Sequence, residues 1–174
     1  ICYKKISDFI IFGGGEIITD ICLFLKKNRK KIIVVTSKQQ ANDFILSKNM
    51  KLKNFLNKNK IEFIIINKND KKWLQLIKKN SFGISHSHRW IFDKDQIKRF
   101  DNKLINFHYS NLPSFRGAGG LTWNILTKRY ISGSTIHLVN EKIDMGFSLM
   151  TRSFSFPKKI RSSLSKMQNY SLLI

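Results

Sequence analysis

The chain has 174 residues, of which 42% are hydrophobic and 12% aromatic, and it carries a formal net charge of +21. This composition excludes an intrinsically disordered chain and fits one globular domain over residues 1–174. No window approaches about 18 uncharged apolar residues, so we expect no membrane-spanning helix and a cytoplasmic location.

The positive charge has two interpretations. It would concentrate phosphate-bearing partners, including nucleic acids, around the protein. However, the basic residues are mostly lysines in KK and NKNK runs with Asn and Ile, without an Arg-rich stripe, which favours a general compositional bias. Cys2 and Cys22 lack CxxC spacing and a neighbouring His, so we interpret both as reduced packing residues.

The first elements form a strand, a glycine turn and a helix, predicted at 8–13 and 16–27. The turn stands where a dinucleotide-binding fingerprint would lie, but Ile18 takes the place of its third glycine. The next strand, KIIVVTS, ends without the carboxylate that binds a ribose hydroxyl. We therefore interpret Gly13 and Gly14 as a tight turn beside a substrate rather than as a nicotinamide site.

Helix and strand patterns alternate through the rest of the chain. Trp73, Leu74 and Ile77 share one face of a predicted helix, and Asp93 is a plausible helix N-cap. Continuous apolar strands separated by helices predict an α/β fold with a doubly wound, mostly parallel Rossmann-like sheet. The further predicted strands are 31–37, 61–67, 82–87, 104–110, 134–140 and one from Phe147 onward, and the further helices are 39–48, 71–79, 93–100 and 121–129.

His86 and His88 form an H-x-H pair in SHSHRW, which suggests a metal. No third ligand has recognisable spacing, so we interpret both as loop histidines beside a ligand pocket and predict no metal site. His137 alternates with apolar residues in STIHLVN and is interpreted as a partnered strand histidine.

Asn106 and His108 lie two apart in NFHYSNLPSFRGAGG, so an extended backbone places both on one face. A third polar residue, Asp144, lies in a turn after a later strand. An amide, an imidazole and a carboxylate meeting at strand ends would suit the attack of an amine on an activated carbonyl. The amide would donate to the oxyanion, the imidazole would stabilise it and relay a proton, and the carboxylate would orient the imidazole. A satisfied core histidine with a turn-capping Asn is the alternative.

The segments NFHYSNLPSFRGAGGLTWNIL and GSTIHLVNEKIDMG closely resemble the signature of the 10-formyltetrahydrofolate-dependent formyltransferases. That family's pattern runs N-x-H-x-S-x-L-P-x-x-(R/K)-G, followed by T-x-H and D-x-G. The match is dense from 106 to 146, and the order of strands and helices agrees back to about residue 8. The resemblance implies a fold of the formyltransferase type and transfer of a formyl group from N10-formyltetrahydrofolate to a primary amine, without a metal.

The resemblance also implies roles for individual residues. The family's catalytic Asn, His and Asp match Asn106, His108 and Asp144. Backbone contacts to the pterin are implied for Arg89, Trp90, Ile91 and Phe92, and the loop closing over it corresponds to Val139, Asn140, Glu141 and Ile143 with Asp144. The loop beside the site corresponds to Ser110, Leu112, Pro113, Arg116 and Gly117.

The acceptor is the less defined part of the prediction. FGGGEI, HRWIF, GAGGLTW and FSFPKKIR look most like the sugar-nucleotide branch, so we expect a nucleotide-linked amino sugar. Methionyl-tRNA, which the charge favours, and the phosphoribosylglycinamide intermediate are the alternatives. A basic nucleic-acid-binding protein with a vestigial site is the non-enzymatic alternative. The family's catalytic domain usually runs somewhat beyond 174 residues, so we also expect a C-terminal truncation. The sequence leaves the oligomeric state open.

Overall fold

The computed structural model describes residues 6–161, 163, 165–167 and 170, a range that excludes Cys2 and the final residues SLLI. It consists of two compact units that divide after Asn106, and each unit is described by itself. None of the helices in the described ranges is long and apolar enough to span a membrane.

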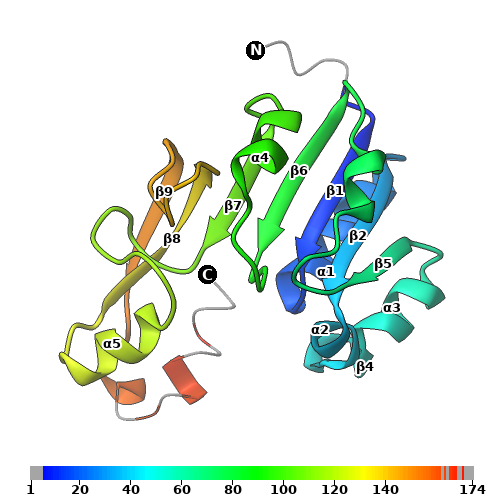
Figure 1. Ribbon diagram of the computed structural model, residues 1–174. Coiled ribbons are helices and arrows are strands. Elements are labelled where there is room, and N and C mark those ends of the chain that lie inside the picture. Colours follow the sequence, from blue (N-terminus) through cyan, green and yellow to red (C-terminus); the bar gives the residue numbers. More distant parts are fainter. Residues whose placement is uncertain (1–5, 162, 164, 168–169, 171–174) are drawn as a thin grey trace. The chain divides into compact units, whose positions relative to one another are not determined.

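The first unit contains a largely parallel sheet (Figure 1). Its strand order is β5-β2-β1-β6-β7, and β7 ends two residues inside the second unit. β1 pairs in parallel with both β2 and β6, and β2 pairs in parallel with β5. The strands are β1 (Asp8–Gly13), β2 (Lys31–Ser37), β5 (Glu62–Ile66), β6 (Ser81–His86) and β7 (Leu104–His108).

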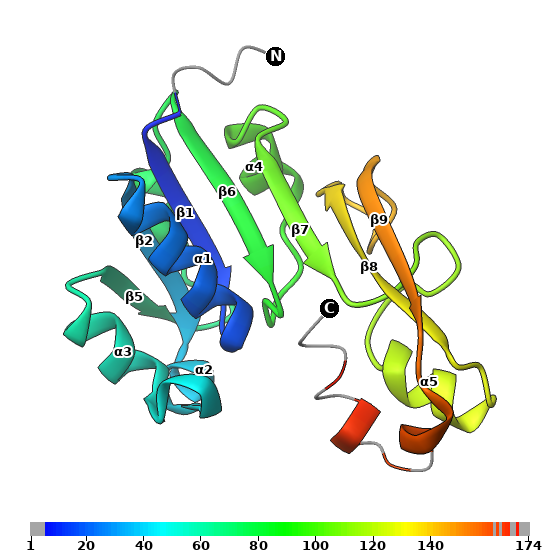
Figure 2. The same ribbon diagram turned by 180° about the vertical axis from the view of Figure 1, so that it is seen from behind.

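Helices cover both faces of this sheet. From β1 the chain runs outward through β2 to β5, then returns to the other side of β1 for β6 and β7. Right-handed crossovers in opposite directions place their helices on opposite faces. Accordingly, α1 (Glu16–Lys27) lies in front of the sheet in Figure 2, and α4 (Lys94–Arg99) lies in front of it in Figure 1. The predicted α/β, doubly wound sheet is confirmed.

The core of the first unit centres on β1, because a central parallel strand is buried on both faces. Phe12 is fully buried and meets the rings of Trp73, Phe92 and Phe100 edge-on, with centroids 4.9, 5.0 and 5.9 Å away. Cys22 is a buried free thiol on the inner face of α1, and burial raises its pKa to about 12. It therefore packs as an apolar side chain, as its sequence context predicts.

Two predicted helices differ from the structure. The helix predicted at 39–48 ends early, because the backbone of Asp43 is extended and Phe44 pairs with Lys51 in a small hairpin. The helix predicted at 71–79 is a short 3₁₀-helix, since the backbone is already extended at Ile77. The elements of this region are α2 (Lys38–Asn42), β3 (Phe44–Ile45), η2 (Leu46–Lys48), β4 (Met50–Lys51), the unpredicted α3 (Leu52–Lys58) and η3 (Lys72–Leu76).

The second unit is built on an antiparallel pair of strands. β8 (Ile131–Leu138) pairs with β9 (Ser148–Ser155), and the register is interrupted by an irregularity between Ile136 and His137. Such irregularities re-aim the side chains beside them. The loop after β7 leads into α5 (Gly120–Leu126), and η4 (Lys158–Ile160) follows β9.

Gly13 allows a close approach between β1 and the end of β6. Its φ is +115°, and a Cβ there would overlap the carbonyl of His86. We expect Gly13→Ala to reduce the free energy of unfolding by about 1–3 kcal/mol. Gly15→Ala is the matched control, since Gly15 also has a positive φ but faces open space. Chemical denaturation should show a clearly larger loss for Gly13→Ala, and equal losses would contradict this packing role.

Candidate active site

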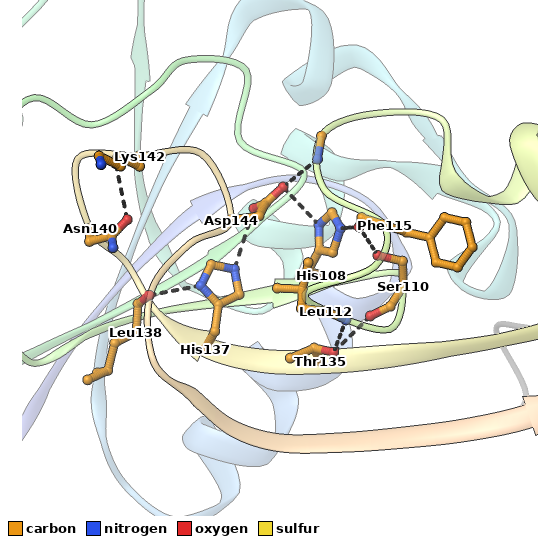
Figure 3. Close-up of polar contacts among 11 residues, drawn as sticks. His108, Ser110, Leu112, Phe115, Thr135, His137, Leu138, Asn140, Lys142 and Asp144 are labelled. Carbon is orange, nitrogen blue, oxygen red and sulfur yellow. Dashed lines mark hydrogen bonds and ion pairs between the residues drawn. The ribbon is translucent and has the colours of Figure 1, made fainter.

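His108 is the last residue of β7 and points toward Asp144 (Figure 3). Its Nδ1 lies 3.6 Å from Asp144 Oδ2, and its Nε2 lies 2.9 Å from the carbonyl oxygen of Phe115. The side chains of His108 and Asp144 are only 14% and 12% exposed, so bulk water screens their interaction weakly. The carboxylate can therefore orient the imidazole, as the sequence predicts.

The turn that contains Asp144 and the contacts of its carboxylate hold that carboxylate in place. Asp144 has a left-handed backbone with a φ of 50°, in the turn between β8 and β9. The turn is closed where the Leu138 N–H donates to the Phe147 carbonyl at 2.9 Å. Asp144 Oδ2 accepts the N–H of Gly117 at 2.8 Å, and Oδ1 lies 3.5 Å from His137 Nε2. The carboxylate is thus held from three directions.

The pKa of Asp144 reflects this environment. Burial raises it, but the hydrogen bonds from His137 and the Gly117 N–H, together with the nearby charges of His108 and His137, outweigh burial. The net result is a pKa below the ordinary value of an aspartate. Asp144 is therefore an anion at neutral pH.

Acid titration should reveal how much the ionised Asp144 carboxylate contributes to the stability of the fold. An Asp with a lowered folded-state pKa stabilises the fold above its unfolded pKa of about 4, and this stabilisation is lost as pH falls through the lowered value. Asp144→Asn should therefore be less stable than the wild type at about pH 6, and the difference should shrink below about pH 4. Denaturant unfolding across this pH series measures it. A difference that does not change with pH would contradict the assignment.

The loop after β7 is tied to β8 through Thr135. The Leu112 N–H donates to Thr135 Oγ1 at 3.2 Å, and that hydroxyl donates to the Ser110 carbonyl at 2.8 Å. The Ser110 hydroxyl donates to the Phe115 carbonyl, which also contacts His108. The loop thereby holds its backbone against the imidazole.

The other predicted residues of the second unit lie in the loop after β7 and in the turn after β8. Gly117 contacts Asp144 directly, while Pro113 and Arg116 are exposed. In the turn after β8, Asn140 Oδ1 accepts the N–H of Lys142 at 3.1 Å. Val139 is half-buried, and Glu141 and Ile143 are exposed.

The remaining predicted residues belong to the first unit. Asn106 is half-buried in β7, two residues before His108, and its catalytic role stays a prediction. At Gly14, a Cβ would lie 3.0 Å from the Cβ of Gln40, so this turn packs tightly. Arg89 donates to Gln39, and the three residues after it range from exposed to buried: Ile91 is exposed, Trp90 half-buried and Phe92 buried.

The H-x-H pair differs in part from its interpretation, because His88 lies in a loop as predicted but His86 does not. His86 is a buried residue of β6 rather than a loop residue. His88 stacks on Phe92 with ring centroids 4.8 Å apart, and burial lowers its pKa to about 4. The His88 ring therefore packs among the rings of Phe12, Trp90 and Phe92. The His86 ring lies 3.2 Å from the Ser87 hydroxyl. In the described residues, no group of three or more His, Cys, Asp or Glu side chains could hold a metal ion.

His137 and Thr135 reach the site although the sequence did not single them out for it. They alternate on one face of β8, and both are buried. The T-x-H spacing was the available signal, but its alternation with apolar residues is equally typical of a core strand.

Solved structures with similar folds include formyltransferases. The phosphoribosylglycinamide formyltransferase of Bacillus halodurans has a TM-score of 0.76 at 16% identity, covering 95% of this chain and 88% of that chain. The N-formyltransferase from Helicobacter canadensis, in complex with folinic acid and dTDP-3-aminofucose, has a TM-score of 0.71 at 22% identity, with coverages of 97% and 61%. The fold is thus that of a formyltransferase.

The amino-acid sequence also matches a known protein family. The formyl transferase family model matches residues 5–158, and the chain therefore belongs to that family. The bifunctional polymyxin resistance protein ArnA of Wigglesworthia glossinidia brevipalpis is 29% identical over 154 residues, covering 86% of this chain and 23% of the relative. Other similar proteins are named methionyl-tRNA formyltransferase and formyltetrahydrofolate deformylase. The chain spans about a quarter to a third of the length of these curated relatives.

Proposed function

We propose that this protein transfers a formyl group from N10-formyltetrahydrofolate to a primary amine. The observation that carries the proposal is the pairing of His108 with an anionic Asp144 at the end of β7, in a chain of the formyl transferase family. No step requires a metal.

The chemistry follows from the three predicted catalytic groups. The amine nitrogen attacks the formyl carbon and forms a tetrahedral intermediate with a negatively charged oxygen. Asn106 and His108 donate to that oxygen, and Asp144 stabilises the positive charge on the imidazole. The bond from the formyl carbon to N10 then breaks, and the proton lost by the amine passes to N10, which yields a formamide and tetrahydrofolate.

The Phe115 carbonyl bears on this step. The Phe115 carbonyl oxygen accepts a hydrogen bond from His108 Nε2. It therefore occupies the donor that the oxyanion would need. Catalytic hydrogen bonds often form only in the complex with substrate. Substrate binding would therefore displace this carbonyl by moving the loop that follows β7.

For the acceptor, we propose a nucleotide-linked amino sugar. The similar fold of an N-formyltransferase crystallised with dTDP-3-aminofucose supports this choice. The second unit also carries nine Lys and Arg residues against two acidic residues, which suits a diphosphate. Pterin contacts are proposed for the segment 89–92 and for the turn 139–144, as the family signature implies.

A panel of acceptors tests the function. The protein is incubated with N10-formyltetrahydrofolate and, separately, a dTDP-linked amino sugar, phosphoribosylglycinamide or methionyl-tRNA, and release of tetrahydrofolate is followed. We expect the fastest release with the amino sugar. Faster release with phosphoribosylglycinamide or methionyl-tRNA would replace the proposed acceptor. Release with formate and no acceptor dependence would indicate hydrolysis, and salt-sensitive RNA binding without folate turnover would favour the non-enzymatic alternative.

A further inference from the structure

Four short segments lead into β2, β5, β6 and β7 of the first unit, and we call them the amino edge. In a largely parallel sheet the segments that lead into the strands lie at the same end of the sheet. Accordingly, the arrows of β1, β6 and β7 all start in the upper part of Figure 1. We propose that the amino edge binds a single strand of nucleic acid through its phosphates. The four segments are 26–31, 58–61, 78–80 and 98–103.

Backbone and side-chain contacts show that these segments are neighbours. Lys26 Nζ donates to a backbone carbonyl of the second segment. Asp8, the first residue of β1, is aligned with Lys31 on one side and with Ser81, which follows the third segment, on the other. The carbonyl of Lys103, in the fourth segment, accepts an N–H of β6 at 2.7 Å. The four segments therefore form one continuous surface.

Positive charge is concentrated at this end of the sheet. The amino edge carries twelve Lys and Arg residues and one acidic residue, Asp101. At the other end of the same strands, the segments 14–17, 38–43, 67–72 and 87–93 carry five basic and four acidic residues. A general bias toward lysine would load both ends alike. The fold thus gathers on one edge the charges that are scattered along the sequence.

The dipoles of the helices account for only part of this charge. Cations in the last turn of a helix interact favourably with its free carbonyls, which covers five of the twelve residues. The other seven lie beyond the helix ends, and Lys78 and Lys79 follow an extended residue. Within the described residues, Lys103 pairs with Asp101 and the other eleven form no ion pair. Their mutual repulsion opposes folding, and the phosphates of a partner would offset it.

The uncharged residues of the amino edge favour a nucleic acid over a membrane surface. Ile61 and Phe100 are buried, whereas binding to a membrane surface needs several protruding apolar side chains beside the charges. Phe24, one turn before the end of α1, is 67% exposed, and a single ring beside basic side chains suits a stacked base. The remaining residues are the amides Asn28, Asn59, Asn80 and Asn102.

Fluorescence anisotropy with a labelled oligouridine of about 20 nucleotides tests this proposal. The logarithm of the association constant should fall with the logarithm of salt concentration with a slope of about −3 to −4, since each phosphate contact contributes about 0.7. The test variant combines three exposed positions from three segments, Lys27→Gln, Lys58→Gln and Lys79→Gln. It should bind at least about 10-fold more weakly at low salt, with a slope shallower by about 2.

The matched control combines Lys38→Gln, Lys51→Gln and Lys68→Gln, which are exposed residues of the same unit outside the amino edge. It loses the same three charges and should bind within about twofold of the wild type. Equal weakening of both variants would show that overall charge attracts the strand, and would overturn the inference. Tighter binding to phosphatidylserine vesicles than to oligouridine would overturn it as well.

Stability and turnover separate this surface from the fold and from the proposed function. The thermal midpoint of the test variant should equal or exceed that of the wild type, because repulsion is relieved, so weaker binding is not a result of unfolding. Both variants should release tetrahydrofolate at the wild-type rate, since none of the six lysines belongs to the candidate active site. If the wild type transfers no formyl group, the proposed function fails, while oligouridine binding still decides this inference.

Discussion

Replacing His108 with alanine should lower turnover by about 10²–10⁴-fold, the usual contribution of a positioned acid–base group. The imidazole at the end of β7 is mostly buried and faces the ionised Asp144, so its loss removes both a donor to the oxyanion and a proton relay. Tetrahydrofolate release at saturating donor and acceptor measures the effect.

Tyr109→Phe is the neighbouring control for His108→Ala. Tyr109 is 37% exposed and follows His108 in sequence. This variant keeps the aromatic ring and should retain close to full turnover. Turnover by His108→Ala at the wild-type rate would show that the imidazole has no part in the chemistry.

The second large effect is expected for Asp144→Asn, which keeps the shape of the side chain and removes its charge. We expect kcat to fall by on the order of 10²–10⁴-fold, because an amide neither fixes the orientation of His108 nor stabilises a positive imidazole. KM for the donor should change much less, since the lost interaction strengthens only in the transition state.

Asp101→Asn is the matched control for Asp144→Asn. Asp101 is an exposed carboxylate that pairs with Lys103 at 3.5 Å in the first unit. Exposed ion pairs contribute little, so kcat and stability should stay near the wild type. A loss of kcat as large as that of Asp144→Asn would point to a general effect of negative charge rather than to the site.

The sequence predicts elements best where local signals agree with packing. The bounds of α1 were predicted correctly, because glycines precede it and Ile18, Cys22 and Leu25 form one buried face. Asp93 caps α4 in a capping box with Gln96, as its position predicted. In contrast, 39–48 reads as a helix, but the pairing of Phe44 with Lys51 overrides that pattern. This hairpin depends on contacts that a window of local periodicity does not contain.

The same distinction applies to the candidate site. The approach of Asp144 to His108 follows from polar residues at strand ends and from the family signature. The contact of His137 with Asp144 does not follow from local periodicity, because a histidine among apolar strand residues is typical of a core. Its 3.5 Å contact with Asp144 depends on the turn made possible by Gly146, which only the folded backbone shows.

Transfer of a labelled formyl group tests the central proposal most directly. The donor is labelled with ¹³C at its formyl carbon and is mixed with the protein and a dTDP-linked amino sugar, and the products are followed by NMR. Our account predicts that the label moves into a formamide on the sugar nitrogen as tetrahydrofolate forms, and that His108→Ala prevents this. Label that remains on the donor, or that is recovered as formate, would contradict it.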